Sequence, residues 1–431
     1  MPPDDRRILR DLAGQVRRIA DQPRMAERRA LWLAHNDLRP VRPMVLCYPE
    51  GAWTELLPDS ALQCRDALAR RWERGLRHTI YWWQHIRDDN VVEPFFDVPW
   101  EISIGDYGVK IPYAHGDQRG SYVWDPPLKD LPADLDRLHF RPLAVDRERT
   151  QRNLALANEI FGDLLPARIR GKYWWTAGLT WEAVKLVGLE QLMLLMYDQP
   201  ETVHRLMAFL RDETLHFIQW FERQELLSPG NGNSYTGSGG VGYTGQLPGN
   251  DGPEFRPAKL GDLWGFAESQ ETVGISPAMF AEFVLPYQLP ILEKFGLNCY
   301  GCCEQLHTRI DRVLAVPRLR RVSVSPWADQ RVMAEHMDKS IIFSRKPNPT
   351  IICMDFDEQR IRHDLRQTLE HAQGRPLEII MKDTHTVQNE PWRIERWVRL
   401  AMDEVARSTG GGAIDDWSRQ TPCPAASPTT A

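Results

Sequence analysis

From about Arg170 onwards, short β-forming segments alternate with amphipathic helices, and this alternation constrains the fold more than any other feature of the chain. In the predicted helix at 200–224, for example, Val203, Leu206, Met207 and Leu210 recur at helical spacing. Strands and helices in alternation imply a parallel sheet, and this many units favour a closed (β/α)8 barrel of the TIM type over an open sheet. The predicted strands lie at 172–180, 263–271, 296–303, 319–326, 340–347 and 377–383.

The chain before this region begins with a helical pattern at 5–35, which predicts an N-terminal helical extension of about 40 residues. It continues with a short buried strand at 42–51, a helix at 62–85, strands and loops at 91–116, and a helix at 146–165. We expect one barrel domain over 1–407, and the composition of 408–431 is typical of a disordered tail.

The composition excludes several classes of protein. A net charge of -6 provides no basic stripe for nucleic acid, and no stretch has the length of a membrane span. The first residues mix acids and bases and lack the apolar run of a signal peptide. Seven cysteines in 431 residues do not make a disulfide framework, and neighbours such as Cys302 and Cys303 rarely bridge each other. We therefore expect a cytoplasmic protein that binds neither nucleic acid nor membrane.

Polar residues concentrate where the predicted strands end. In a barrel of this type the active site lies at the carboxyl ends of the strands. In chain order, these ends carry Glu268, Gln270 and Glu271; Cys302, Cys303 and Glu304; Ser325 and Trp327; Arg345 and Lys346; and Lys382, Asp383 and His385.

The segment GLNCYGCCEQLH, which contains Cys302, Cys303 and Glu304, is the centre of the predicted site. Thiolate, carboxylate and imidazole are ligands of borderline-soft divalent metals, so these residues with His385 make a candidate metal site. Alternation along a strand predicts that the two thiols point to different sides, with Cys302 as the first choice of ligand. Two alternatives stay open: the cysteines belong to the core or to redox chemistry, and His385 is an ordinary hydrogen-bonded loop residue.

A Gly-rich insertion at 228–253 contains SGGVGYTG, whose backbone could cradle a phosphate. Because no Walker-type lysine follows, we favour a flexible lid over the barrel mouth, with Tyr235 or Tyr243 reaching the substrate. Arg345 and Lys346 form either an anion-binding pair or a surface pair.

The segment at 276–314 resembles the uroporphyrinogen decarboxylase-like superfamily, most closely its methyltransferase branch. In that branch a helix with a Phe-Pro-Tyr-type segment leads into a strand that ends in His-x-Cys-Gly. Here Pro286 and Tyr287 match the helix, while Tyr300, Cys302 and Cys303 fall on the His, Cys and Gly positions. The resemblance extends more weakly from about residue 42 to 406.

The resemblance implies zinc-dependent methyl transfer between a corrinoid protein and a thiol or another acceptor. Zinc in that branch is held by the His and Cys of the motif and by a second Cys near the last strand. On this chain the resemblance implies Cys302 as a ligand, with Tyr300 in place of the usual histidine. His385 or Asp383 would replace the second Cys, and Glu304 would complete the set.

We therefore expect a metal-dependent methyl- or alkyltransferase that acts on a small O-, N- or S-methyl substrate or on a thiol acceptor. Its cofactors would be zinc or another divalent metal and a corrinoid carried by a partner protein. The expected catalytic residues are Glu268, Glu271 and Asp383, and the expected substrate contacts are Gln270, Tyr243, Trp327, Arg345, Lys346 and Lys382. Two alternatives stay open: a cofactor-free decarboxylase or lyase, and a non-catalytic partner-binding barrel. A homodimer also stays open.

Overall fold

The computed structural model describes residues 1–431 except 116–121, 172–175, 250–251, 253 and 411–431.

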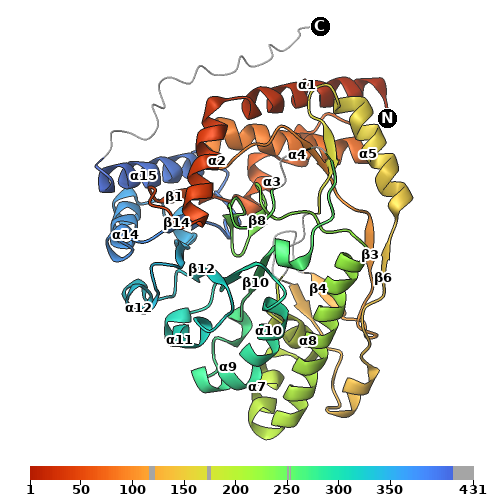
Figure 1. Cartoon of the computed structure of the whole chain (residues 1–431), viewed down its shortest axis with the longest axis vertical. Helices are drawn as coiled ribbons and strands as arrows, with labels where there is room; N and C mark the ends of the chain where they lie inside the picture. The colour runs from red at the N-terminus through yellow and green to blue at the C-terminus, as the bar shows by residue number, and fades with distance from the viewer. Residues whose placement is uncertain (116–121, 172–175, 250–251, 253, 411–431) are drawn as a thin grey trace.

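Six parallel strands form the central sheet, which lies among the helices in Figure 1. Their order is β1-β14-β13-β12-β11-β10, so the first strand of the chain pairs with the last. The strands are almost entirely buried, as expected for parallel strands that are covered on both faces. Their bounds are β1 Met44–Cys47, β10 Trp264–Ala267, β11 Leu297–Tyr300, β12 Leu319–Val324, β13 Ile342–Arg345 and β14 Leu377–Met381.

A separate parallel pair consists of β2 (Phe96–Val98) and β7 (Ala167–Ile169). The strand pairings of the described residues do not join this pair to either edge of the six-stranded sheet. The prediction of an α/β fold with a parallel sheet is therefore confirmed, and the arrangement is consistent with a TIM-like fold. Closure of a complete barrel is not shown.

Helices surround the sheet, and the predicted N-terminal helical extension is present as α1 and α2. Inward and outward side chains alternate along the strands. Val45 and Ile379 pack in the larger apolar core with the outer helices, whereas Met44 and Ile380 share a second core with the N-terminal helices. The helices are α1 Pro3–Ala20, α2 Pro23–Asn36, α3 Trp53–Leu56, α4 Ala67–Tyr81, α5 Arg147–Phe161, α6 Thr180–Val187, α7 Leu189–Asp198, α8 Pro200–Arg223, α9 Pro277–Phe283, α10 Leu285–Leu292, α11 Ile310–Val313, α12 Gln330–His336, α13 Thr350–Cys353, α14 Glu358–His371 and α15 Trp392–Ser408.

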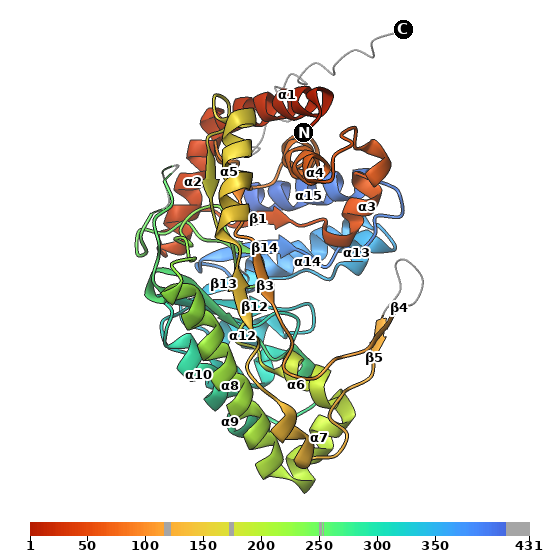
Figure 2. The same ribbon diagram turned by 90° about the vertical axis from the view of Figure 1, so that its right-hand side faces the viewer.

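Short antiparallel ribbons complete the fold. The predicted strands and loops at 91–116 are found as β2, β3 and β4, and Figure 2 shows the ribbon of β4 and β5 extending from the body of the molecule. The bounds of the ribbon strands are β3 Ile102–Ile104, β4 Tyr113–His115, β5 Tyr122–Trp124, β6 Leu143–Val145, β8 Tyr235–Thr236 and β9 Gly240–Val241. No helix of the described residues is long and apolar enough to cross a membrane.

Several predicted boundaries change for local reasons. The helix predicted at 62–85 begins only at Ala67, because the Asp66 side chain caps it by accepting the N–H groups of Leu68 and Ala69. The helix expected in the 276–314 segment divides at Val284 into α9 and α10, next to Pro286. Of the strand predicted at 172–180, residues 172–175 lie outside the described residues, and Thr180 already begins α6. The predicted tail likewise lies outside them from residue 411, whereas Ser408 still belongs to α15.

The hairpin of β8 and β9, which belongs to the predicted lid, is largely buried and packs against side chains of the central sheet. Its tip packs against side chains of the central strands, since a Cβ atom added to Gly237 would lie 2.7 Å from the Cβ atom of Cys299. Gly237 and Gly239 also have φ angles of 58° and 114°, which side chains rarely tolerate. The glycines therefore let the hairpin pack closely against side chains of the central strands, and the flexibility of this predicted lid stays a prediction.

Candidate active site

A tight turn follows β11 and carries Cys302, Cys303 and Glu304. Gly301 begins the turn with a φ angle of 90°, where a side chain would collide with Leu306. The Glu304 carboxylate accepts the backbone N–H of Cys302 at 2.7 Å and that of Ser269 at 2.9 Å. This carboxylate therefore fixes the turn and joins it to the end of β10.

Two serines of and after β12 hold the same turn from the other side. The Ser323 hydroxyl donates to the carbonyl of Cys302 at 2.9 Å, and the Ser325 hydroxyl donates to the carbonyl of Glu304 at 2.9 Å. Ser325, one of the predicted strand-end residues, therefore helps to hold the turn in place.

The two thiols lie side by side, with 3.6 Å between their sulfur atoms. The prediction that they point to different sides is wrong. Alternation holds only within a strand, whereas β11 ends at Tyr300 and the cysteines follow the turn at Gly301. Tyr300 faces away from them and donates its hydroxyl to the side-chain oxygen of Gln288 at 2.8 Å.

Cys302 is surrounded by groups that stabilise its thiolate. Besides Cys303, its sulfur lies 3.4 Å from the Ser238 hydroxyl and 3.6 Å from the Lys382 ammonium. The hydrogen bond from Cys303, together with Lys382 and Ser238, outweighs burial and lowers the pKa of Cys302 to about 7. The site therefore favours the thiolate of Cys302, although only 5% of the residue is exposed.

Lys382 stays a cation in this site. Burial would lower its pKa, but the charges of Tyr235, Cys302 and Asp383 outweigh burial and hold the pKa above its ordinary value. Its Nζ atom lies 3.4 Å from the Ser238 hydroxyl and 3.7 Å from the Asp383 carboxylate. Lys382, which was predicted to contact the substrate, therefore lies next to the Cys302 thiolate.

Cys303 faces the predicted catalytic residue Asp383. The Cys303 sulfur lies 3.6 Å from the Asp383 carboxylate, and the neighbouring Cys302 sulfur is the main reason that the pKa of Cys303 is raised. The backbone N–H of Asp383 in turn donates to the Glu50 carboxylate at 3.1 Å. Burial raises the pKa of Glu50.

A group of carboxyl side chains lies next to the turn. Burial, followed by the charges of Glu271 and Glu304, raises the pKa of Glu268 well above its usual range and so favours its protonated form. The backbone N–H of Gln270 donates to Glu268 at 3.1 Å, and the Thr180 hydroxyl donates to Glu271 at 2.7 Å. The three predicted residues Glu268, Gln270 and Glu271 are thus brought together.

Deeper between the strands lies a buried ionic network. The Glu378 carboxylate lies 2.8 Å from the Arg321 guanidinium and 3.2 Å from the His35 imidazole, and it accepts the Ser344 hydroxyl. Lys346 donates to Ser344, and burial lowers the pKa of Lys346 to about 7. Of the predicted anion-binding pair, Lys346 therefore faces the interior.

The structure places other predicted residues outside this cluster. Arg345 points away from Lys346, donates to the carbonyl of Ser325 at 2.8 Å and pairs with Asp364 of α14 at 2.9 Å, so the two cations do not form one anion-binding pair. Tyr243 is buried against the N-terminal helices and donates its hydroxyl to Glu93 at 2.9 Å. Trp327 follows β12 and is 59% exposed.

The predicted metal ligands are not assembled into one site. Glu304 is engaged by backbone N–H groups, and the exposed His385 lies against Gly51. Cys302 and Cys303 offer two adjacent sulfurs, but the Lys382 cation lies beside the first. Among the residues that the structure describes, no group of three or more His, Cys, Asp and Glu side chains could hold a metal. The donor set therefore does not fit the zinc site that the resemblance implies.

Two residues of the site escaped the sequence analysis. Ser238 belongs to a glycine-rich segment whose folding between the strands follows from no local pattern. Glu50 comes three residues after β1 ends at Cys47. Glu50 nevertheless follows the rule that polar residues gather at strand ends, since it comes shortly after the first strand.

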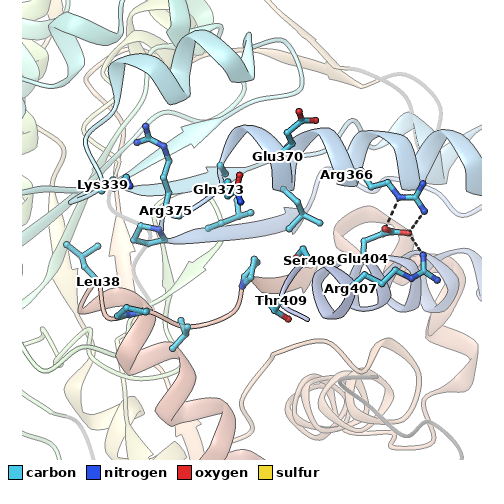
Figure 3. Close-up of a pocket in the computed structure, with 18 of the residues that line it drawn as sticks. Leu38, Lys339, Arg366, Glu370, Gln373, Arg375, Glu404, Arg407, Ser408 and Thr409 are labelled. Atoms are coloured by element: carbon cyan, nitrogen blue, oxygen red, sulfur yellow. Dashed lines mark hydrogen bonds and ion pairs between the residues drawn. The ribbon is translucent and has the colours of Figure 1, made fainter. Parts of the chain in front are cut away.

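A large cavity lies at the opposite end of the sheet (Figure 3). Its volume is about 930 Å³, and Pro43 and Pro376, which precede β1 and β14, belong to its lining. Glu404 pairs there with Arg366 at 2.9 Å and with Arg407 at 2.8 Å. Because it opens at the amino ends of the strands, this cavity is separate from the Cys302 site.

Comparison with known proteins extends the picture of the fold. No protein-family model and no curated protein sequence matches the chain. Among solved structures, a methyltransferase from Methanosarcina mazei is similar, with a TM-score of 0.51 and 11% sequence identity. The alignment covers 88% of this chain and 98% of that one. At this identity, the similarity establishes a shared fold.

Proposed function

We propose that this protein transfers a methyl or other small alkyl group, with the sulfur of Cys302 as its reactive atom. The observation that carries the proposal is the convergence of Lys382, Ser238 and Cys303 on one buried sulfur at the carboxyl ends of parallel strands. Sites of TIM-type enzymes lie at that end of the sheet. The similar fold of the methyltransferase from Methanosarcina mazei supports the choice of reaction class.

In the proposed step, the Cys302 thiolate attacks the methyl carbon of an O-, N- or S-methyl substrate. A carbon–sulfur bond forms, and the bond between carbon and the leaving heteroatom breaks. Lys382 keeps the sulfur ionised before the attack, since a thiolate rather than a thiol is the nucleophile.

The leaving group needs a proton, and Glu268 is the residue best suited to supply it. Burial raises the pKa of this carboxyl group well above its usual range and so favours its protonated form, and the charge of Cys302 is among the causes of that shift. Glu268 thus passes its proton to the leaving atom and becomes a carboxylate, while Cys302 becomes a thioether. Transfer of the alkyl group to a second acceptor restores the thiolate.

A corrinoid on a separate protein remains the proposed carrier that exchanges the methyl group with this site. The resemblance of the 276–314 segment to corrinoid-linked methyltransferases supports it. The proposed chemistry includes no step on zinc, because the donor set described above does not fit one.

A cofactor-free decarboxylase or lyase is the second candidate, and the two buried lysines favour it. Lys346 and Lys382 are both buried, and the charge of Lys382 contributes to the lowered pKa of Lys346. Such an enzyme would release CO2 from an acidic substrate, and its activity would survive the loss of Cys302.

The test is a search for the methylated intermediate. The full chain is incubated with isotopically labelled methylcobalamin and with a panel of labelled O-, N- and S-methyl compounds, and peptide 295–309 is sequenced by mass spectrometry. We expect label on Cys302 in the wild-type protein and in Cys299→Ser, but none in Cys302→Ser. Turnover of a methyl donor that is unaffected in Cys302→Ser would refute the proposal.

A further inference from the structure

The paired thiols also have the geometry of a redox couple. Their sulfur atoms are 3.6 Å apart, so the two must approach by about 1.5 Å to reach the length of a disulfide bond. Both sulfurs already lie on one side of the turn, and Cys303 is half-buried rather than sealed in the core. Only a small movement of the two sulfur atoms is therefore needed to form a disulfide after oxidation.

The two thiols differ in the way that such a couple requires. Cys302 lies beside the Lys382 ammonium and the Ser238 hydroxyl, which stabilise a thiolate that can attack an oxidant. The Cys303 sulfur lies 3.6 Å from both the Cys302 sulfur and the Asp383 carboxylate. Asp383 is thus positioned to accept the thiol proton of Cys303 when Cys303 attacks.

The turn limits how stable the oxidised form can be. Glu304, Ser323 and Ser325 hold the backbone of the turn in place. A disulfide between neighbouring residues closes a small ring and twists this backbone, and strained disulfides are reduced readily. This strain favours a reversible bond over a permanent structural one.

We propose that Cys302 and Cys303 form a reversible redox pair in which a hydroperoxide converts the two thiols into a disulfide and so removes the reactive thiolate. Cys302 first attacks a peroxide oxygen, which breaks the O–O bond, gives the sulfenic acid and releases water or an alcohol. The Cys303 sulfur then attacks the Cys302 sulfur, passes its proton through Asp383, and expels hydroxide that leaves as water. One molecule of peroxide is reduced for each disulfide formed. Only the consequence, loss of alkyl transfer, rests on the proposed function.

The experiment uses hydrogen peroxide on the full chain and reads the mass of the protein before and after treatment with dithiothreitol. We expect the wild-type protein to lose two hydrogens and to regain them on reduction. The variant Cys303→Ser cannot close the bond, so Cys302 should instead gain oxygen atoms and progress to forms that dithiothreitol does not restore. Cys303→Ala serves as a second variant if the serine variant does not fold.

Cys299 provides the matched control, because it lies on the same tryptic peptide and in the same apolar cluster as Cys302. Cys299→Ser should still form the disulfide. Cys353→Ser, at a half-buried thiol elsewhere, should also behave as the wild type does. An unchanged mass in the wild-type protein, or a disulfide that persists in Cys303→Ser, would overturn the redox proposal and leave the alkyl-transfer proposal untouched.

Discussion

Cys299 and Cys302 stand three residues apart, are both buried, and each has a cation beside its sulfur. Arg321 lies 3.5 Å from the sulfur of Cys299, and Lys382 lies 3.6 Å from that of Cys302. Nevertheless, burial raises the pKa of Cys299, whereas the pKa of Cys302 is lowered to about 7. A nearby cation is therefore not sufficient to activate a buried thiol.

The difference lies in what else each cation and each sulfur meets. Arg321 is paired with the Glu378 carboxylate, whose charge also raises the pKa of Cys299. Cys302 receives a hydrogen bond from Cys303 and lies near the Ser238 hydroxyl in addition to Lys382. Cys299 thus lies against the buried ion pair of Arg321 and Glu378, in which Glu378 is the anion. At the other site, the Cys302 thiolate itself is the anion beside the cation.

The largest expected effect is the loss of folding stability when Arg321 is replaced. Arg321→Met leaves the buried Glu378 without its main partner, and loss of one member of a buried ion pair costs about 3–5 kcal/mol. Urea denaturation should show this loss at neutral pH. Arg331→Met, at an arginine that is 68% exposed, should cost less than about 1 kcal/mol.

The same variant should show a defined pH dependence. Arg321 is the main partner that holds the pKa of Glu378 well below its usual range, so the stability it provides is present above the ordinary pKa of a glutamate. That stability is lost as the pH falls and Glu378 takes up a proton. The difference between wild type and Arg321→Met should therefore shrink in acid, and a difference that grows would contradict the assignment.

The second prediction compares the two thiols directly. At pH 7, iodoacetamide should modify Cys302 at least about a hundredfold faster than Cys299, because only Cys302 is substantially a thiolate. Time-resolved peptide sequencing resolves the two sites. Cys303 is more exposed than Cys302 but has a raised pKa, so it should also react more slowly. Faster labelling of Cys303 would mean that exposure, and not ionisation, controls reactivity.

The fold could be predicted to this extent because its signals are local. Short apolar strands and amphipathic helices are encoded within each segment, and the strands β10 to β14 fell where the pattern placed them. The strand-end rule likewise brought Cys302, Lys382 and Asp383 together, because parallel strands end at a common edge.

The rest of the site depends on contacts that no local pattern encodes. The direction of Cys303 follows from the single positive φ angle at Gly301, which interrupts the alternation of the strand. The place of Ser238 follows from a hairpin whose glycines fit around Cys299 and Arg321. Arg345 and Lys346 are adjacent in sequence, but Arg345 ends β13 and pairs with Asp364, whereas Lys346 follows the strand and donates to Ser344. The metal ligands were predicted from residue type alone. The hydrogen bonds that the Glu304 carboxylate accepts from backbone N–H groups do not follow from the sequence.

The third prediction concerns the cation beside Cys302. Lys382→Met removes the charge that lies 3.6 Å from the sulfur, so the pKa of Cys302 should rise by about one pH unit or more. Because the thiolate is the main form only above this pKa, the pH profile of iodoacetamide labelling should move to higher pH. Lys339→Met, at an exposed lysine beside the distant cavity, should leave the profile unchanged. An unshifted profile in Lys382→Met would show that Cys303 and Ser238 alone keep the pKa of Cys302 low.

The smallest expected effect is a change in the pKa of Cys302 when a hairpin hydroxyl is removed. It gives the most direct comparison of the Cys299 and Cys302 environments. Ser238 approaches the Cys302 sulfur at 3.4 Å, whereas Thr236 lies near Cys299 but accepts a hydrogen bond from Arg321 at 3.0 Å. Ser238→Ala should therefore raise the pKa of Cys302 by about half a pH unit, measured by the same labelling profile, while Thr236→Val should not move it. Equal shifts in both variants would mean that the hairpin acts through its packing between the strands. A shift in Ser238→Ala alone would mean that one hydroxyl, delivered by a glycine-rich tip, helps to distinguish a reactive thiol from a structural one three residues away.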